Sequence, residues 1–253
     1  MRKKFIEVGN DERKAIAFAN SLDMNYLKNV QKVKVKDHYV PTLEVVNKLK
    51  NEGWKINGVA EIRNKKSRKI QENIVQMHHP DFAIKNALGK DEAFSSLTIT
   101  NSCNGSKPLT MGLGAYRMVC SNGMIAYDSH AEKSAIKHTK QGVNNIDTIL
   151  ANLNNRAQSI ITHLSGWKDK QLTKDQIKKL SLEAAKLKYT KLPENFSTDS
   201  LADVRRDEDK SNDLWTVYNR IQENLTEDVK DPQMDIWLNQ QLHNVFSQNY
   251  ALA

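Results

Sequence analysis

Hydrophobic and polar residues alternate with a period of two through the middle of the chain, over residues 96–128. Two Asn-Gly pairs, Asn104-Gly105 and Asn122-Gly123, interrupt this alternation. An Asn-Gly pair between alternating apolar runs is the strongest short-range signal for a β-hairpin. The segment is therefore predicted to be an antiparallel β-meander with a turn at each pair.

The chain before the meander shows both helical and strand-like periodicity. The expected elements are, in order, a helix over residues 11–22, a strand over 32–40, a helix from Pro41-Thr42 to Gly53, and two strands over 54–64 and 70–79. The last two strands are expected to form a hairpin around the basic turn Asn64-Lys65-Lys66-Ser67-Arg68-Lys69. Pro80 is expected to end the hairpin's second strand, because proline cannot donate a ladder hydrogen bond.

A last short strand is expected over residues 134–139, and after Gln141 the hydrophobic residues recur at helical spacing. This spacing predicts a long helix over 145–165, a helix capped by Thr173, and two more over 214–225 and 236–246. The fold class is predicted to be α+β, with an N-terminal antiparallel sheet and helices followed by a helical C-terminal half. The expected parts are an α+β domain over 1–141, holding the β-meander and the basic hairpin, and a helical region over 142–253 that packs on it.

Length and composition exclude several classes of protein. The 253 residues suffice for one large domain or two small ones. Apolar runs are only a few residues long, far below the roughly 20 that span a bilayer, so no membrane partner is predicted. The basic N-terminus lacks the apolar region of a signal peptide. Cys103 and Cys120 are too few for a disulfide framework, which favours a reducing, cytoplasmic setting.

The positive charge is concentrated in one quarter of the sequence. The chain has a net charge of +8. Residues 28–90 contain 14 Lys or Arg and 6 Asp or Glu, whereas the rest of the chain contains 24 of each. A localised basic segment is the expected footprint of a polyanion such as nucleic acid, although a solubilising surface would show the same pattern.

The candidate nucleic-acid contacts follow from this distribution. Lysine is a hydrated point charge suited to phosphates, and arginine can bind them bidentately. Tyr116 and Arg117 in the meander are expected either to stack on bases and grip phosphate, or to belong to the core and to pair with an acid. The full set of candidates is Lys32, Lys34, Lys36, Lys65, Lys66, Arg68, Lys69, Tyr116 and Arg117.

No pattern typical of catalysis stands out. Gly112-Leu113-Gly114 lacks the third glycine and the following helix of a phosphate-binding loop. His78 and His79 are adjacent on a predicted strand and so point to opposite faces. The mixed charges over 203–209 are expected to form surface or helix-end ion pairs. The spacings of Cys103, Cys120, His130 and His138 match no zinc-binding pattern. Asp128, Glu132 and Asp147 are scattered and form no acid–base pair. The sequence therefore predicts no metal, no cofactor and no enzymatic reaction.

Three sets of motifs resemble a known protein family. The meander contains Asn-Ser-Cys-Asn-Gly-Ser over 101–106 and Tyr-Arg-Met-Val-Cys-Ser-Asn-Gly-Met over 116–124. Val-Pro-Thr over 40–42 precedes Glu-Gly-Trp over 52–54, and Leu-Trp over 214–215 precedes Asn-Arg-Ile-Gln-Glu-Asn over 219–224. Together they resemble a phage- and plasmid-related family catalogued as a domain of unknown function, of the nine-three-two type. Many members have His-Asp where this chain has Cys103-Asn104.

The family resemblance implies a phage, prophage or plasmid setting without an established activity. The order of helix, basic hairpin, further strands and long helix also resembles the core of single-strand annealing proteins, which form rings or filaments and hold the DNA backbone in a basic groove. One expected function is a non-enzymatic nucleic-acid-binding protein of phage or plasmid DNA metabolism, with single-stranded DNA as the favoured partner and a homo-oligomer as one option. The alternative is a mobile-element counter-defence protein that binds and inhibits a host protein.

Overall fold

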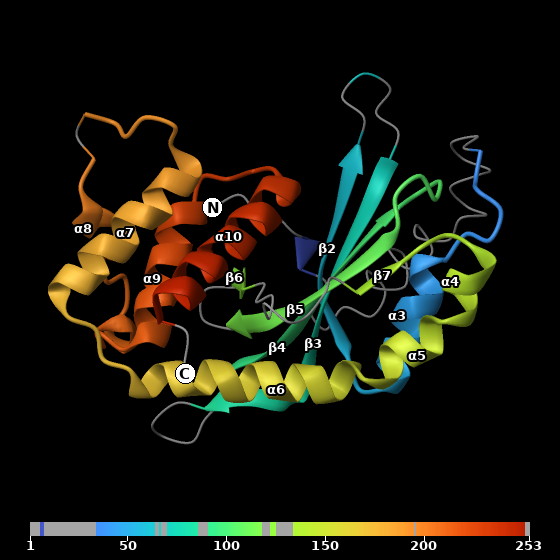
Figure 1. Ribbon diagram of the computed structural model, residues 1–253, viewed down its shortest axis with the longest axis horizontal. Coiled ribbons are helices and arrows are strands. Elements are labelled where there is room, and N and C mark those ends of the chain that lie inside the picture. The colour runs from blue at the N-terminus through green and yellow to red at the C-terminus, as the bar shows by residue number, and fades with distance from the viewer. Residues whose placement is uncertain are drawn as a thin grey trace.

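An antiparallel sheet lies at the centre of the molecule, with helices on either side of it (Figure 1). The computed structural model describes residues 6–7, 34–63, 66, 70–85, 91–117, 122–124, 134–194 and 196–250. Among these residues, no helix is long and apolar enough to cross a membrane. The predicted α+β class is confirmed, because the sheet comes first in the chain and a helical half follows.

The described part of the sheet has seven strands, which pair in the order β1-β2-β3-β4-β5-β6, while β7 also pairs with β5. All the pairings are antiparallel. The strands are β1 (Ile6–Glu7), β2 (Lys55–Arg63), β3 (Ile70–Lys85), β4 (Asp91–Ser102), β5 (Leu109–Arg117), β6 (Asn122–Met124) and β7 (Ser134–Ile136).

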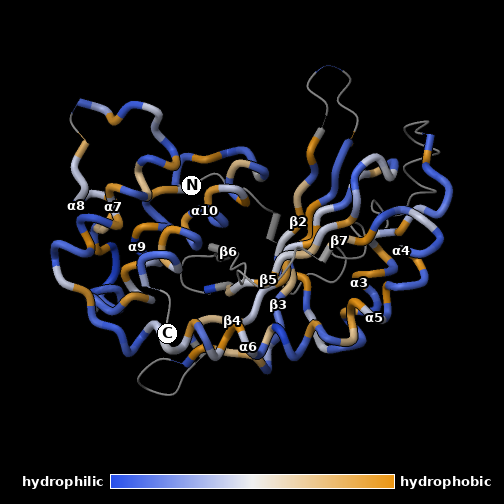
Figure 2. Tube along the Cα trace, in the orientation of Figure 1, coloured by the Kyte–Doolittle hydropathy of each residue, from blue (hydrophilic) through white to orange (hydrophobic). Residues whose placement is uncertain are grey.

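Helix α6 (Leu153–Gly166) runs past the sheet and packs on β3, β4 and β5 (Figure 1). Hydrophobic and hydrophilic residues alternate along it (Figure 2), as expected for a helix with one buried face. Helices α7, α9 and α10 pack together on one side of the sheet. The other helices and 3-10 turns are α3 (Thr42–Asn51), α4 (Lys140–Asn144), α5 (Ile146–Ala151), η1 (Trp167–Asp169), α7 (Lys174–Lys188), α8 (Thr198–Leu201), η2 (Asp207–Asp209), α9 (Leu214–Thr226) and α10 (Pro232–Tyr250).

Several local predictions are confirmed. A turn at Asn104-Gly105 joins β4 to β5, and Gly105 has the positive φ of 76° that such a turn requires. The expected helix begins after Pro41 and Gly53 follows its end. Thr173 caps α7 through a reciprocal pair of hydrogen bonds with Gln176. These features depend on a few neighbouring residues, so the sequence alone indicates them.

The segment 34–40 is not the predicted strand. Its backbone has no regular secondary structure and turns at Asp37-His38, where His38 has a φ of 57°. The N–H of Lys36 donates to the carbonyl of Asn104 at 3.1 Å, in place of a strand ladder. Alternating Lys and Val therefore marks an irregular segment with one side against the protein. The rest of that predicted strand, and the predicted helix over 11–22, lie outside the described residues.

Pro80 does not end the second strand of the hairpin. β3 continues to Lys85, and its pairing with β4 shifts register between His79 and Ala83. A bulge of this kind leaves the bulged residues without ladder partners, so the missing N–H of proline costs nothing there. The prediction is wrong because a bulge tolerates the proline.

Two further boundaries differ from the prediction. Asn122-Gly123 lies within β6 and pairs with Arg117 and Tyr116, so this pair is not the turn. The expected helix over 145–165 is divided into α5 and α6 at Asn152, whose ψ is 0°. In both cases the sequence pattern predicted the strand or the helix, but the turn or the break lies at a different residue from the one expected.

The two faces of the sheet differ in chemistry, as β4 shows. Leu97 and Ile99 are fully buried in the main hydrophobic core, which also contains Leu164 of α6. Thr98 and Thr100 point to the opposite face, because side chains alternate along a strand. The sheet thus has an apolar face against α6 and a face with small polar side chains.

Gly53 is expected to resist substitution. Its φ is 96°, and a Cβ added there would lie 2.7 Å from Nε2 of His79, which bonds the carbonyl of Glu52. Gly53→Ala should lower the free energy of unfolding by about 1–3 kcal/mol, measured by urea denaturation. Glu52→Ala, in the same turn with an exposed side chain, should change it by less than about 0.5 kcal/mol. Equal effects of the two substitutions would contradict this explanation.

Candidate nucleic-acid interface

The β2–β3 hairpin and the β4–β5 turn lie at the same end of the sheet (Figure 1). Arg63 pairs with Ile70, so the end of β2 lies beside the start of β3. Glu72 of β3 pairs with Ser102 of β4, which places the start of β3 beside the end of β4. The antiparallel register therefore brings the Arg63–Ile70 end of the hairpin and the Asn104-Gly105 turn to the same end of the sheet.

The segment 34–40 is attached to this end of the sheet. Val35 packs on a small apolar cluster formed by Ile70 and Cys103, at the start of β3 and just after β4. Lys34 and Lys36, on either side of Val35, are exposed. The segment 34–40, which is distant in sequence from the β4–β5 turn, thus adds two cations to the same end of the sheet.

The β4–β5 turn presents a further lysine. The hydroxyl of Ser102 donates to the carbonyl of Lys107 at 2.8 Å and accepts from its N–H at 3.0 Å. These two bonds hold the backbone of the turn. The ammonium of Lys107 pairs with Glu72, while its side chain remains 63% exposed.

His138 ties the chain that follows β7 to the same end. Its Nδ1 accepts the N–H of Val40 at 3.0 Å, so Nε2 carries the proton and donates to the carbonyl of Lys107 at 2.8 Å. The ring also stacks on Tyr39, at 4.9 Å between centroids. Lys137 and Lys140, next to His138, are exposed beside the β4–β5 turn.

These contacts define one surface, which we call the basic end of the sheet. It consists of the described lysines Lys34, Lys36, Lys66, Lys107, Lys137 and Lys140. Glu72 pairs with Lys107, and Asp37 follows Lys36 in the chain, so the six lysines outnumber these two acids. Four separate chain segments contribute lysines, and the pairing of β3 with β4 and of β5 with β7 places these segments at the same end of the sheet.

The predicted contacts are distributed unevenly over the described structure. Lys34, Lys36 and Lys66 lie at the basic end. The structure adds Lys107, Lys137 and Lys140, which sequence reasoning missed because only strand register places them there. The positions of Lys32, Lys65, Arg68 and Lys69, and the side chain of Tyr116, lie outside the described residues.

Arg117 takes the second of its two predicted roles, because it pairs with acids inside the protein. Its side chain is 3% exposed, with Nη2 located 2.7 Å from Oδ1 of Asp209 and 3.3 Å from Oε1 of Glu92. Glu92 also pairs with Lys168 and accepts from the Trp215 indole at 2.9 Å. This cluster joins the end of β5 to η2 and α9 and leaves Arg117 unavailable to phosphate.

The charges over 203–209 divide between surface and interior. Arg205 pairs with the exposed Glu227 at 2.6 Å, as expected for a surface ion pair. Arg206 pairs with Glu223 at 2.5 Å. Asp209 is only 1% exposed, which the sequence did not indicate, because its partner Arg117 is distant in the chain.

His138 is expected to make stability depend on pH. Burial, together with the nearby charge of Lys36, lowers the pKa of His138, and the bond to the Lys107 carbonyl only partly opposes this. The unfolded chain therefore takes up the proton more readily than the folded protein. The contribution is fully present above the ordinary histidine pKa of about 6.5 and is lost as pH falls below it.

We expect His138→Asn to reduce this acid sensitivity. Urea midpoints measured from about pH 7.5 to pH 5 should fall less steeply in the variant than in the native protein. Burial also lowers the pKa of His78, so some acid sensitivity should remain. An unchanged pH dependence would show that His138 is not the responsible group.

The described residues contain no group of three or more His, Cys, Asp or Glu side chains arranged to hold a metal ion. The two adjacent histidines of β3 do point apart, as expected. His79 stacks on Phe82, with 4.1 Å between ring centroids, whereas His78 lies beside Phe94.

The motif residues behind the family resemblance form hydrogen bonds within the protein. The Asn101 amide nitrogen lies within 3.0 Å of three acceptors, two of which belong to Val40 and Thr42 of the Val-Pro-Thr motif. In α9, Glu223 pairs with Arg206 and Gln222 donates to Asn239 at 2.7 Å. These motifs therefore stabilise the fold in the described structure.

Comparison with known proteins gives a family and no activity. The family model described as "Domain of unknown function (DUF932)" matches residues 32–243. The chain is 23% identical over 195 residues to "UPF0380 protein YfjQ" of Escherichia coli (strain K12), covering 74% of this chain and 67% of the relative. "UPF0380 protein YafZ" of the same organism matches with the same identity and coverage. No solved structure gives a significant match.

Proposed function

We propose that this chain, which belongs to the DUF932 family, binds single-stranded nucleic acid through the basic end of its sheet. Single-stranded DNA is the favoured partner, and phage or plasmid DNA metabolism in the cytoplasm is the proposed setting. The observation that carries the proposal is the gathering of lysines from four chain segments at one end of the sheet. Scattered cations would give a basic protein without a binding surface.

The chemistry of the basic end favours backbone contacts. Lysines neutralise phosphates and release condensed counterions, which gives salt-dependent binding with little sequence preference. Arg117, the arginine in the meander, is internally paired and contributes no bidentate contact.

The shape of the basic end favours a single strand over a duplex. Its lysines come from separate segments of the chain, and Lys140 begins α4. A single strand can bend to reach lysines on separate segments, whereas a duplex is stiff, with a persistence length of about 150 base pairs. We therefore expect tighter binding of single strands than of duplexes at the same salt.

The direct test is fluorescence anisotropy with labelled single- and double-stranded oligonucleotides of mixed sequence. We expect binding of the single strand at about 50 mM salt that weakens steeply towards 200 mM. The duplex of the same sequence should bind less tightly. Absence of single-strand binding at the lower salt concentration would refute the proposed function.

A further inference from the structure

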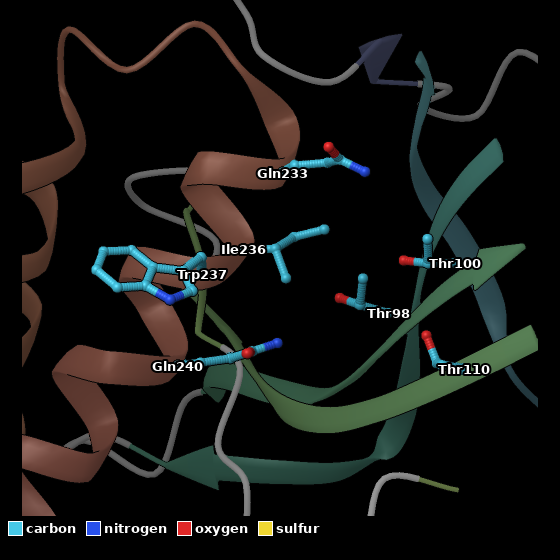
Figure 3. Close-up of a pocket in the computed structure, with 7 residues that line it drawn as sticks. All are labelled: Thr98, Thr100, Thr110, Gln233, Ile236, Trp237 and Gln240. Carbon is cyan, nitrogen blue, oxygen red and sulfur yellow. The ribbon is translucent and has the colours of Figure 1, made fainter. Parts of the chain in front are cut away.

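A pocket lies between the polar face of the sheet and α10. Figure 3 shows threonines of β4 and β5 facing α10, with Ile236 and Gln240 directed towards them and the Trp237 ring directed away from the strands. The pocket has a volume of about 200 Å³. Its described lining residues are Thr98, Thr100, Thr110, Gln233, Ile236, Trp237 and Gln240.

The lining suits an uncharged, flat and polar ligand. Threonine hydroxyls and glutamine amides can each donate and accept hydrogen bonds, and none of the described lining residues is ionisable. Ile236 adds an apolar surface. The volume is smaller than the roughly 300–1,000 Å³ of pockets for drug-sized ligands, which favours a single ring system.

The pocket adjoins the basic end of the sheet. The amide nitrogen of Gln233, on its rim, donates to Oε2 of Glu72 at 3.0 Å. The other carboxylate oxygen of Glu72 pairs with Lys107 of the basic end. Thr110 lies three residues after Lys107, near the start of β5. One carboxylate therefore bonds both a lysine of the basic end and a glutamine of the pocket lining.

We propose that the pocket receives one unstacked nucleobase of a strand whose phosphates contact the basic end. This inference depends on the proposed function and adds a base subsite to it. Unstacked bases are commonly bound by hydrogen bonds to their Watson–Crick edges and by contact with apolar or aromatic side chains. In this pocket, glutamine amides and threonine hydroxyls can supply the hydrogen bonds, and Ile236 can supply the apolar contact.

The test compares two oligonucleotides that carry the same number of phosphates. One is an ordinary single strand, and the other has abasic sites in its central part. We expect the native protein to bind the ordinary strand about tenfold more tightly, the size of effect typical for one stacked and hydrogen-bonded base. Both strands should show the same salt dependence, because their phosphate contacts are the same.

Variants of the pocket should remove this preference. Gln240→Leu and Thr98→Val each delete polar groups from the lining while keeping similar volume, and valine suits a strand. Each should lower the preference for the ordinary strand severalfold and leave binding of the abasic strand unchanged. Gln248→Leu, an exposed position on the same helix outside the pocket lining, is the matched control and should keep the full preference.

Trp237 gives a second readout. It is 41% exposed, whereas Trp54, Trp167 and Trp215 are at most 1% exposed. Binding of the ordinary strand should change the tryptophan emission, the abasic strand should change it less, and Trp237→Phe should abolish the difference.

The outcomes separate the two proposals. Equal affinity for the ordinary and abasic strands, with native and variant pockets alike, would overturn the base subsite and leave the basic end intact. Absence of binding to either strand would refute the proposed function and this inference with it.

Discussion

Replacing Arg117 with methionine is expected to lower the free energy of unfolding by about 2 kcal/mol or more, because Asp209 and Glu92 lose their most buried cation and keep only Arg206 and Lys168 as partners. Arg117 and Asp209 are 3% and 2% exposed at their side chains and lie 2.7 Å apart. Methionine fills a similar volume, so the loss should come from the charge. Urea denaturation of the native and variant proteins measures the change.

Two further substitutions make this expectation specific. Lys210→Met removes the partner of Asp207 in an exposed ion pair, with side chains 70% and 91% exposed, and should cost less than about 1 kcal/mol. Adding Asp209→Asn to Arg117→Met should restore part of the stability, because the amide replaces a buried carboxylate that has lost its closest partner, while Arg206 keeps Glu223. A small effect of Arg117→Met, or no recovery in the double variant, would show that the buried pair does not hold the sheet to the helical half.

Replacing Lys34, Lys36, Lys137 and Lys140 together with alanine is expected to weaken single-strand binding by about 100-fold or more near 0.1 M salt. Each phosphate contact contributes about 0.7 to the salt exponent of a single strand, so four contacts together have an effect of this size. All four side chains are exposed, so stability should change little. Anisotropy titration with a labelled single strand measures the weakening.

The matched control removes the same charge from the opposite side of the molecule. Lys174, Lys178 and Lys186 of α7, with Lys191 just after it, are also exposed. Helix α7 lies far from the basic end of the sheet (Figure 1). Replacing these four lysines together with alanine should reduce the affinity for a single strand only severalfold, through the change in net charge alone. Similar reductions in the two variants would mean that binding depends on total charge rather than on the basic end.

Local sequence signals predicted much of the fold. The Asn104-Gly105 turn, the helix before Gly53 and the Thr173 cap each depend on residues within one turn or helix end. The same type of signal failed at Pro80 and at Asn122-Gly123, where strand pairing determined the outcome. A bulge accommodates the proline, and the ladder extends through the second Asn-Gly pair.

The candidate interface was only partly predictable for a related reason. Clustering of cations in residues 28–90 indicated a basic surface, and Lys34 and Lys36 flank Val35, which packs at the start of β3. Lys107 and Lys137 were missed, because only the pairing of β5 with β4 and β7 brings them to the same end of the sheet. The hydrophobic periodicity of a sequence does not show which strands, distant in the chain, pair with each other.

The role of Arg117 shows the same limit in the protein interior. The sequence left open whether it meets phosphate or an acid, and its partner Asp209 lies in η2, far along the chain. Likewise the pocket combines Thr98 with Gln240, from opposite halves of the chain. The motifs that carry the family resemblance make hydrogen bonds within the described structure, so we expect them to preserve this architecture.

The central claim is tested most directly by the salt dependence of single-strand affinity in the native protein and in a hairpin-turn variant. The variant replaces Lys65, Lys66, Arg68 and Lys69 with alanine. A plot of log affinity against log salt should be steep for the native protein, and the variant should flatten it by up to about 2.8, or about 0.7 for each phosphate that is no longer neutralised. Identical slopes and affinities for the two proteins would contradict the claim that this end of the sheet binds phosphates.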